Sequence, residues 1–162
     1  MPEDVRRLKK VTRVKQCAMK LIISATDGSE GAERAAEVAA ELAKSVNAKL
    51  LIVNVSKERE FSRAELRQLD RLHVTEGDAL EEVSQRIMKR TAALARDGGA
   101  VNIETMGGAG DAAKVLTEIA DIRHADAIVV GRRGLGQLGG LLLGSVSQEL
   151  ASSAPCTVVV VP

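Results

Sequence analysis

A glycine-rich stretch that ends in a serine is the first place in this sequence where residue types and spacing indicate chemistry. Its pattern is Gly131-x2-Gly134-x9-Gly144-Ser145. Glycine lets backbone N–H groups approach an anion without a Cβ atom in the way, and a helix N-terminus adds unpaired amides and the positive end of its dipole. We expect a helix to begin near Ser145, whose hydroxyl can serve as N-cap and as phosphate donor. The spacing therefore predicts a phosphate-binding loop.

A carboxylate follows the first buried segment of the chain. Asp27 comes directly after the apolar run 21–25. Beside a polyphosphate a carboxylate is repelled unless a metal ion intervenes, so its natural partners are ribose hydroxyls or an adenine amine. Two interpretations of Asp27 stay open: it contacts a bound nucleotide, or it only caps the following helix, with Ser29 as the rival cap.

Two better-known nucleotide motifs do not fit the glycine-rich stretch. Gly134-x-Gly136-x-x-Gly139 matches the dinucleotide fingerprint formally, but that fingerprint follows the first strand and precedes an acid by about twenty residues. Here it comes late, and residues 155–162 contain no acid. A Walker A loop needs Gly-Lys-Ser/Thr, whereas residues 139–141 read Gly-Gly-Leu. The sequence therefore disfavours classical NAD binding and Walker-type hydrolysis.

No set of residues predicts a catalytic centre. His73 and His124 are far apart in the sequence, and we expect both on the surface. Cys156 has no histidine near it in the sequence and is expected to be a small buried hydrophobe. Without a Ser/His/Asp or Cys/His arrangement, we expect no dedicated catalysis.

Short apolar runs alternate with helical patterns from residue 20 onward. This alternation predicts parallel strands joined by crossover helices, a doubly wound α/β fold with five strands. Between the second strand and the second helix, residues 56–77 form a polar, partly helical insertion in which Ser62 and Glu65 have capping-box spacing. The predicted strands are 21–25, 50–55, 101–106, 127–130 and 157–161, and the predicted helices are 30–45, 78–97, 111–123 and 145–153.

Length and composition limit the possible classes of protein. The chain has 162 residues, 45% of them hydrophobic and 28% charged, which is typical of one globular domain and excludes an integral membrane protein. A net charge of +1 disfavours bulk nucleic-acid binding, and we expect no DNA partner. Phe61 is the only aromatic residue, so a bound base must lie against aliphatic groups. Two cysteines without a pairing pattern favour a reduced, cytoplasmic compartment.

The first residues differ in charge from the rest. Residues 1–18 form a basic extension before a body at 19–162, and the apolar run at its end is too short for a secretory signal. Val5, Leu8 and Val11 recur at a loose helical spacing. The extension is therefore either a solvated tail or an amphipathic arm for a membrane surface, RNA or a partner.

Several of these segments together resemble the universal stress protein family. They are Asp27-Gly28-Ser29-Glu30, the run 129–136, and the run from Leu142 to Cys156. The likeness covers about residues 19 to 161, and its most specific part is the glycine spacing, which resembles that of the subgroup that binds ATP. The chain departs from the common pattern in its basic extension and in the pair Arg132-Arg133.

The resemblance implies a Rossmann-like fold of the adenine nucleotide alpha hydrolase type, with strand order 3-2-1-4-5, around a universal stress protein domain at 19–162. It also implies bound ATP, ADP or AMP, with Mg²⁺ or Mn²⁺ held by the phosphates and not by the protein. The nucleotide-binding residues that the resemblance implies are Ala25, Thr26, Asp27, Val55, Gly131, Gly134, Gly144, Ser145 and Val146. We add three of their sequence neighbours, which are Val130, Arg133 and Ser147.

In the implied order the uncharged run 157–161 is an edge strand, and pairing with the same strand of a second copy would cover it, as in related family members. We therefore expect a homodimer. The expected function is that of a cytoplasmic adenine-nucleotide-binding stress regulator that acts through partners without dedicated catalysis. One alternative is a slow ATP hydrolase or phosphotransferase, and another is a scaffold that uses the basic arm.

Overall fold

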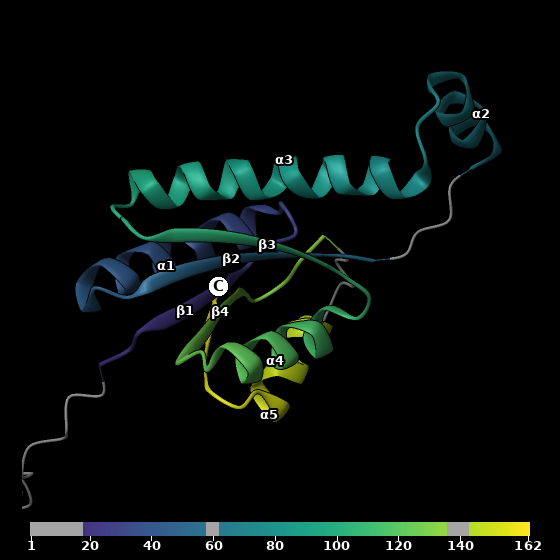
Figure 1. Ribbon diagram of the computed structural model, residues 1–162. Helices are drawn as coiled ribbons and strands as arrows, with labels where there is room; N and C mark the ends of the chain where they lie inside the picture. The colour runs from purple at the N-terminus through teal and green to yellow at the C-terminus, as the bar shows by residue number, and fades with distance from the viewer. Residues whose placement is uncertain (1–17, 58–61, 136–142) are drawn as a thin grey trace, which may run out of the picture.

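The five strands form one parallel sheet. The computed structural model describes residues 18–57, 62–135 and 143–162, so the predicted basic extension lies outside the described residues except for Ala18. The strand order is β3-β2-β1-β4-β5 (Figure 1), which confirms the predicted fold. The strands are β1 (Leu21–Ala25), β2 (Lys49–Ser56), β3 (Ile103–Ala109), β4 (Ala127–Gly131) and β5 (Thr157–Val161).

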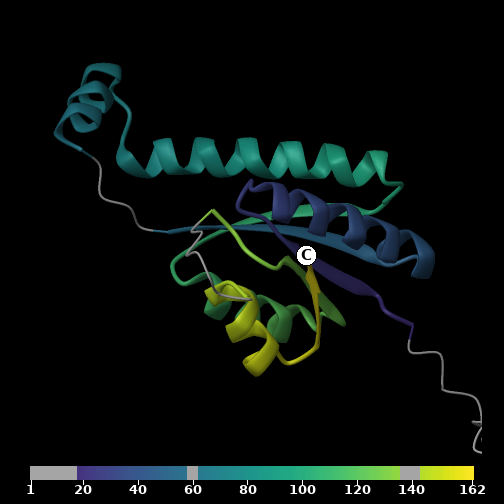
Figure 2. The same ribbon diagram turned by 180° about the vertical axis from the view of Figure 1, so that it is seen from behind.

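Two layers of helices cover the two faces of the sheet. α1 (Glu30–Val46) and α3 (Glu76–Asp97) lie on one face, and α4 (Ala112–Arg123) and α5 (Ser145–Ser153) lie on the other (Figures 1 and 2). β1 and β4 are buried along nearly their whole length because helices cover both sides of them. α1 approaches the sheet closely, since its buried face is made of six alanines: Ala32, Ala35, Ala36, Ala39, Ala40 and Ala43.

The third strand differs from its prediction. It was expected at 101–106 and lies at Ile103–Ala109, while the side chain of Val101 is 95% exposed. β3 is an edge strand beside the long strand β2, and the two pair as far as Ser56 and Ala109. Backbone pairing therefore carries the strand through Gly107 and Gly108, which have no side chain to signal it. The other predicted strands and crossover helices agree with the structure to within two residues.

The polar insertion contains a separate helix, α2 (Arg63–Leu72). The predicted capping box is confirmed: the Glu65 amide donates to Ser62 Oγ at 3.3 Å, and the Ser62 amide donates to Glu65 Oε2 at 2.9 Å. A second capping box, between Thr75 and Asp78, starts α3 two residues earlier than predicted. α2 projects beyond the body at the amino end of α3 (Figure 1), and none of the residues of α2 is buried. None of the helices in the described ranges is long and apolar enough to span a membrane.

The order of the strands creates the place where a ligand can bind. β1 pairs with β2 on one side and with β4 on the other, so the chain direction around the sheet reverses between β1 and β4. The connections that leave these two strands run to opposite faces of the sheet, and in open parallel sheets this point at the carboxyl edge is where ligands bind. Asp27 follows β1 there and Gly131 ends β4, which brings the two parts of the predicted site to one edge.

Candidate functional site

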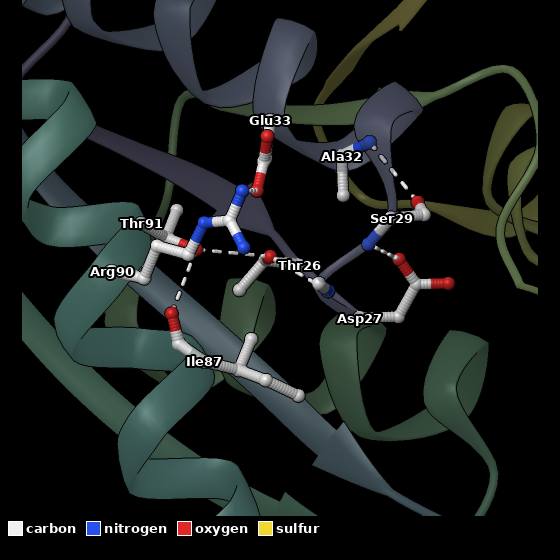
Figure 3. A network of polar contacts seen from close by, with 9 residues as sticks. Thr26, Asp27, Ser29, Ala32, Glu33, Ile87, Arg90 and Thr91 are labelled. Carbon is white, nitrogen blue, oxygen red and sulfur yellow. Dashed lines mark hydrogen bonds and ion pairs between the residues drawn. The ribbon is translucent and has the colours of Figure 1, made fainter.

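Asp27 joins the two connections at this edge. Its Oδ1 accepts a hydrogen bond from the Ser29 amide at 3.0 Å, and its Oδ2 accepts one from the Leu135 amide at 2.8 Å. Ser29 is the N-cap of α1, because its Oγ accepts from the Ala32 amide at 3.2 Å (Figure 3). The structure thus decides the capping question in favour of Ser29. Asp27 instead ties the turn after β1 to the loop after β4.

Two glycines of the predicted loop are required by the protein's own packing. A Cβ atom on Gly131 would lie 2.7 Å from the carbonyl carbon of Gly31 and 2.8 Å from its oxygen, because the first turn of α1 passes directly over the end of β4. A Cβ atom on Gly134 would clash with Oδ2 of Asp27. The sequence interpretation assigned these glycines to anion approach, and the structure adds that helix packing and the Asp27 contact already exclude side chains there.

The start of α5 corrects one expectation. The N-cap is Gly144, which makes no side-chain cap, and Ser145 is the first helical residue, so the prediction of Ser145 as N-cap is wrong. The reason lies in Arg132, whose carbonyl accepts from the Gly144 amide at 2.8 Å. Ser147 Oγ lies 3.0 Å from the carbonyl oxygens of both Arg132 and Gly144, and its single hydrogen is donated to one of them. The bond from the Gly144 amide fixes the chain one residue earlier than expected, and it leaves Ser145 exposed at the amino end of the helix.

The amino end of α5 carries backbone donors that have no acceptor within the helix. The first backbone bond of this helix runs from the Gln148 amide to the Gly144 carbonyl at 3.0 Å. The amides of Ser145, Val146 and Ser147 therefore have no acceptor within the helix, as in the first turn of any α-helix, and they carry the positive end of its dipole. An anion at this point would be bound by backbone groups.

The other predicted residues divide into exposed and buried groups. Ala25, Val55 and Val146 are half-buried and pack at the margin of the core under α4 and α5. Arg133 is half-buried, whereas Arg132 is exposed. Thr26, Val130 and Ser147 are buried, with 5%, 3% and 2% of their surface exposed. Their side chains pack inside the protein, so they shape the site from beneath.

The polar groups of Thr26 are engaged within the protein. Its amide donates to the Val53 carbonyl at 2.9 Å, and its carbonyl accepts from Asn54 Nδ2 at 2.8 Å. Its Oγ1 lies 3.1 Å from Oγ1 of Thr91 on α3. The turn that carries Asp27 is therefore held by β2 and α3 through groups that lie beneath the surface.

The histidines, the cysteine and the acidic residues of the described ranges do not form a metal-binding cluster. Among ranges 18–57, 62–135 and 143–162, no three His, Cys, Asp or Glu side chains gather to hold a metal ion. His73 and His124 end α2 and α4 as exposed C-caps, which confirms their predicted place on the surface. Cys156 packs against the core, where burial and then the charge of Asp126 raise the pKa of its thiol above the ordinary value.

A family model described as the universal stress protein family matches residues 19–162. The chain belongs to this family. A universal stress protein of Thermus aquaticus is 36% identical over 149 residues, which cover 88% of this chain and 98% of that protein. One of Mycobacterium tuberculosis is 31% identical over 146 residues, covering 89% and 97%.

Solved structures of universal stress proteins share the fold. The crystal structure of a universal stress protein in complex with cAMP has a TM-score of 0.64 and 30% identity, and the match covers 89% of this chain and 97% of that one. An Archaeoglobus fulgidus universal stress protein in complex with dAMP has a TM-score of 0.62 and 21% identity, covering 89% and 98%. The second likeness concerns the fold alone.

Sequence patterns did not reveal two residues that shape the site of this universal stress protein. Thr91 lies 65 positions from the threonine that it contacts, and the sequence offers only a polar residue on the buried face of a predicted helix. Asn54, inside an otherwise apolar strand, was a clearer signal, because a buried amide needs partners. The role of Ser147 in holding the loop depends on the fold.

Proposed function

We propose that this universal stress protein is a cytoplasmic stress regulator that binds an adenine nucleotide at the carboxyl ends of β1 and β4 and acts through protein partners, without dedicated catalysis. The observation that carries the proposal is the meeting of three features at one edge: the Asp27 carboxylate, the glycine loop after β4, and the amino end of α5. The cAMP complex of a relative that is 30% identical supports an adenine nucleotide as the ligand.

The phosphates would bind at the amino end of α5. The amides of Ser145, Val146 and Ser147 are donors without an acceptor in the helix. The Gly144 amide already donates to the Arg132 carbonyl at 2.8 Å, so Gly144 contributes open space for the anion and not a donor. Arg133 adds positive charge beside the loop. Backbone N–H donors of this kind can bind one, two or three phosphate groups, so ATP, ADP and AMP are all suitable ligands.

The nucleoside would lie over the ends of β1 and β2. Asp27 offers carboxylate acceptors to ribose hydroxyls or to the adenine amine, and the half-buried Ala25, Val55 and Val146 offer an apolar wall to the ring. Thr26 and Val130 support this wall from below. In this assignment the adenine ring packs against aliphatic carbon.

A divalent ion, Mg²⁺ or Mn²⁺, would arrive with the nucleotide. The described residues offer no cluster of three ligands, whereas adjacent phosphates supply hard oxygen ligands by themselves. The ion would neutralise phosphate charge near Asp27, and it would matter more for ATP than for AMP.

The homodimer is also a proposal, and the direction of the β5 backbone supports it. The Thr157 amide donates to the Asp126 carbonyl and the Val161 carbonyl accepts from the Arg132 amide, so residues 157 and 161 point their polar groups toward β4. Along a strand, the N–H and C=O groups of successive residues point alternately to one side and to the other. Val158 and Val160 therefore point their N–H and C=O groups to the open edge, where the same strand of a second copy can pair with them.

Purification of the natural chain followed by mass spectrometry of what it carries tests the proposal directly. We expect adenine nucleotide in the denatured extract, and we expect ATP and AMP to bind the stripped protein in calorimetry with submillimolar affinity. GTP and CTP are the matched controls for the base. A stripped, folded protein that binds neither ATP nor AMP would refute nucleotide binding.

A further inference from the structure

A chain of hydrogen bonds connects the turn that presents Asp27 to helix α3. Thr91 Oγ1 donates to the Ile87 carbonyl at 3.0 Å and lies 3.1 Å from Thr26 Oγ1, and the Gly28 amide donates to Thr26 Oγ1 at 3.3 Å. A hydroxyl has a single hydrogen. Either Thr91 donates to Ile87 and Thr26 donates to Thr91, or Thr91 donates to Thr26, and in both arrangements the Thr26 oxygen keeps a lone pair that accepts from the Gly28 amide.

The same turn of α3 contacts the connection from β1 to α1, which carries Asp27, in two further ways (Figure 3). Gly28 has a φ of +81°, and a Cβ atom there would lie 3.2 Å from Cγ1 of Ile87, so the isoleucine packs closely against the turn. Arg90 forms an ion pair of 2.7 Å with Glu33 in the first turn of α1. α3 thus holds residues 26–33 by a hydroxyl chain, an apolar contact and an ion pair.

We propose that Thr91 is a positioning residue for nucleotide binding. Thr91 is 1% exposed and Thr26 is 5% exposed, so a ligand does not reach the Thr91 hydroxyl. Its effect passes through Thr26 to the Gly28 amide, which fixes the chain on both sides of Asp27. This orientation lets the Asp27 carboxylate face the loop after β4, where it accepts from the Leu135 amide. The role rests on the proposed nucleotide binding at Asp27.

Two substitutions at position 91 separate the hydroxyl from the rest of the side chain. Thr91→Val has nearly the same shape but leaves the Thr26 hydroxyl without its partner at position 91, and we expect it to weaken AMP binding about three- to tenfold, the usual range for one lost hydrogen bond. Thr91→Ser keeps the hydroxyl and should retain affinity within about twofold. Thr117→Val is the matched control, because Thr117 Oγ1 on α4 is buried with no hydrogen-bond partner among the described residues.

A double-mutant cycle distinguishes positioning from general stability. In an Asp27→Ala background, Thr91→Val should change AMP affinity by less than about twofold, since the group that it orients is gone. The full three- to tenfold loss in that background would show that Thr91 acts independently of Asp27 and would overturn the proposal. Thermal unfolding of each variant gives the stability change separately.

The Gly28 amide gives a readout that needs no ligand. Hydrogen exchange at Gly28 should be faster in Thr91→Val than in the wild type and unchanged in Thr117→Val. If Thr91→Val does not fold, Thr26→Val breaks the same chain from its other end. Wild type that binds neither AMP nor ATP refutes the proposed function and with it this role, whereas wild-type binding with unchanged Thr91→Val affinity refutes the positioning role alone.

Discussion

The Asp27 carboxylate and the Leu135 amide, 108 positions apart in the sequence, are joined by a hydrogen bond of 2.8 Å. The other carboxylate oxygen of Asp27 accepts from Ser29. One carboxylate therefore ties the connection after β1 to the loop after β4. A ligand that offers donors to Asp27 must share or replace these bonds, which makes the residue sensitive to the nucleoside part of a nucleotide.

Asp27→Ala should weaken the binding of AMP and ADP by similar factors, roughly tenfold or more, because a carboxylate prefers donors to anions and hydrogen bonds to charged groups are strong. Calorimetry with both nucleotides measures the two losses. A loss that grew strongly with each added phosphate would mean that Asp27 acts through a metal ion.

Gly144→Val should lower the affinity for ATP at least about tenfold, or roughly 1.4 kcal/mol. The added carbon atoms would occupy the place of the phosphates, and the Cβ atom itself would lie 3.3 Å from the Arg132 carbonyl oxygen. Gly77→Val in the first turn of α3 is the matched control, since a Cβ atom there meets nothing closer than 3.7 Å. Equal ATP affinity in the wild type and Gly144→Val would remove this loop from the binding site.

Any ATP turnover should be well below the roughly 1–10³ s⁻¹ that is usual for enzymes, because the described site offers positioning groups and no general base. Release of phosphate from ATP, followed through successive purification steps, measures it. Fast, metal-dependent turnover that follows the protein through those steps would favour the hydrolase alternative.

Val160→Pro should shift the protein toward monomer in light scattering. It removes an outward-facing N–H from β5 and leaves the bonds to β4 in place. Val160→Ala is the control that loses a comparable side-chain contact and keeps the N–H. Nucleotide affinity should not change in either variant. A wild type that is monomeric at tens of micromolar would contradict edge pairing.

Glu104→Gln should destabilise the protein at neutral pH and have less effect in acid. Hydrogen bonds from Arg123 and then Lys49 lower the pKa of Glu104 below its ordinary value of 4.5. A carboxyl whose pKa is lowered by folding stabilises the fold above its ordinary pKa and loses that contribution as the pH falls through the lowered value. Urea unfolding at pH 7 and pH 3 should therefore show a smaller difference between the two proteins at pH 3.

The sequence was informative where one physical requirement controls the residue type. Parallel strands covered on both faces must be almost continuously apolar, so β1 and β4 were predicted with bounds that agree with the structure to within one residue. The capping box at Ser62 is a local pattern and was equally clear. Asp27 and Gly131 were placed at one edge because strand order determines which connections meet.

Features that depend on contacts between distant residues were not predictable. The bond from the Gly144 amide to the Arg132 carbonyl places the N-cap at Gly144 instead of Ser145. The position at which β3 ends depends on the length of its neighbour β2, and the sequence of β3 contains no signal for that length. Thr91 looks like any threonine on a helix until the fold sets it against Thr26.

The contact between β4 and the first turn of α1 means that part of the glycine spacing would persist in evolution even without ligand binding. A Cβ atom on Gly131 would lie 2.7 Å from Gly31, and one on Gly31 would lie 2.9 Å from the Arg133 carbonyl oxygen. A descendant that had lost its ligand would still need glycine at both positions to keep the helix on the sheet. Gly131 is therefore a marker of ancestry and not of ligand binding.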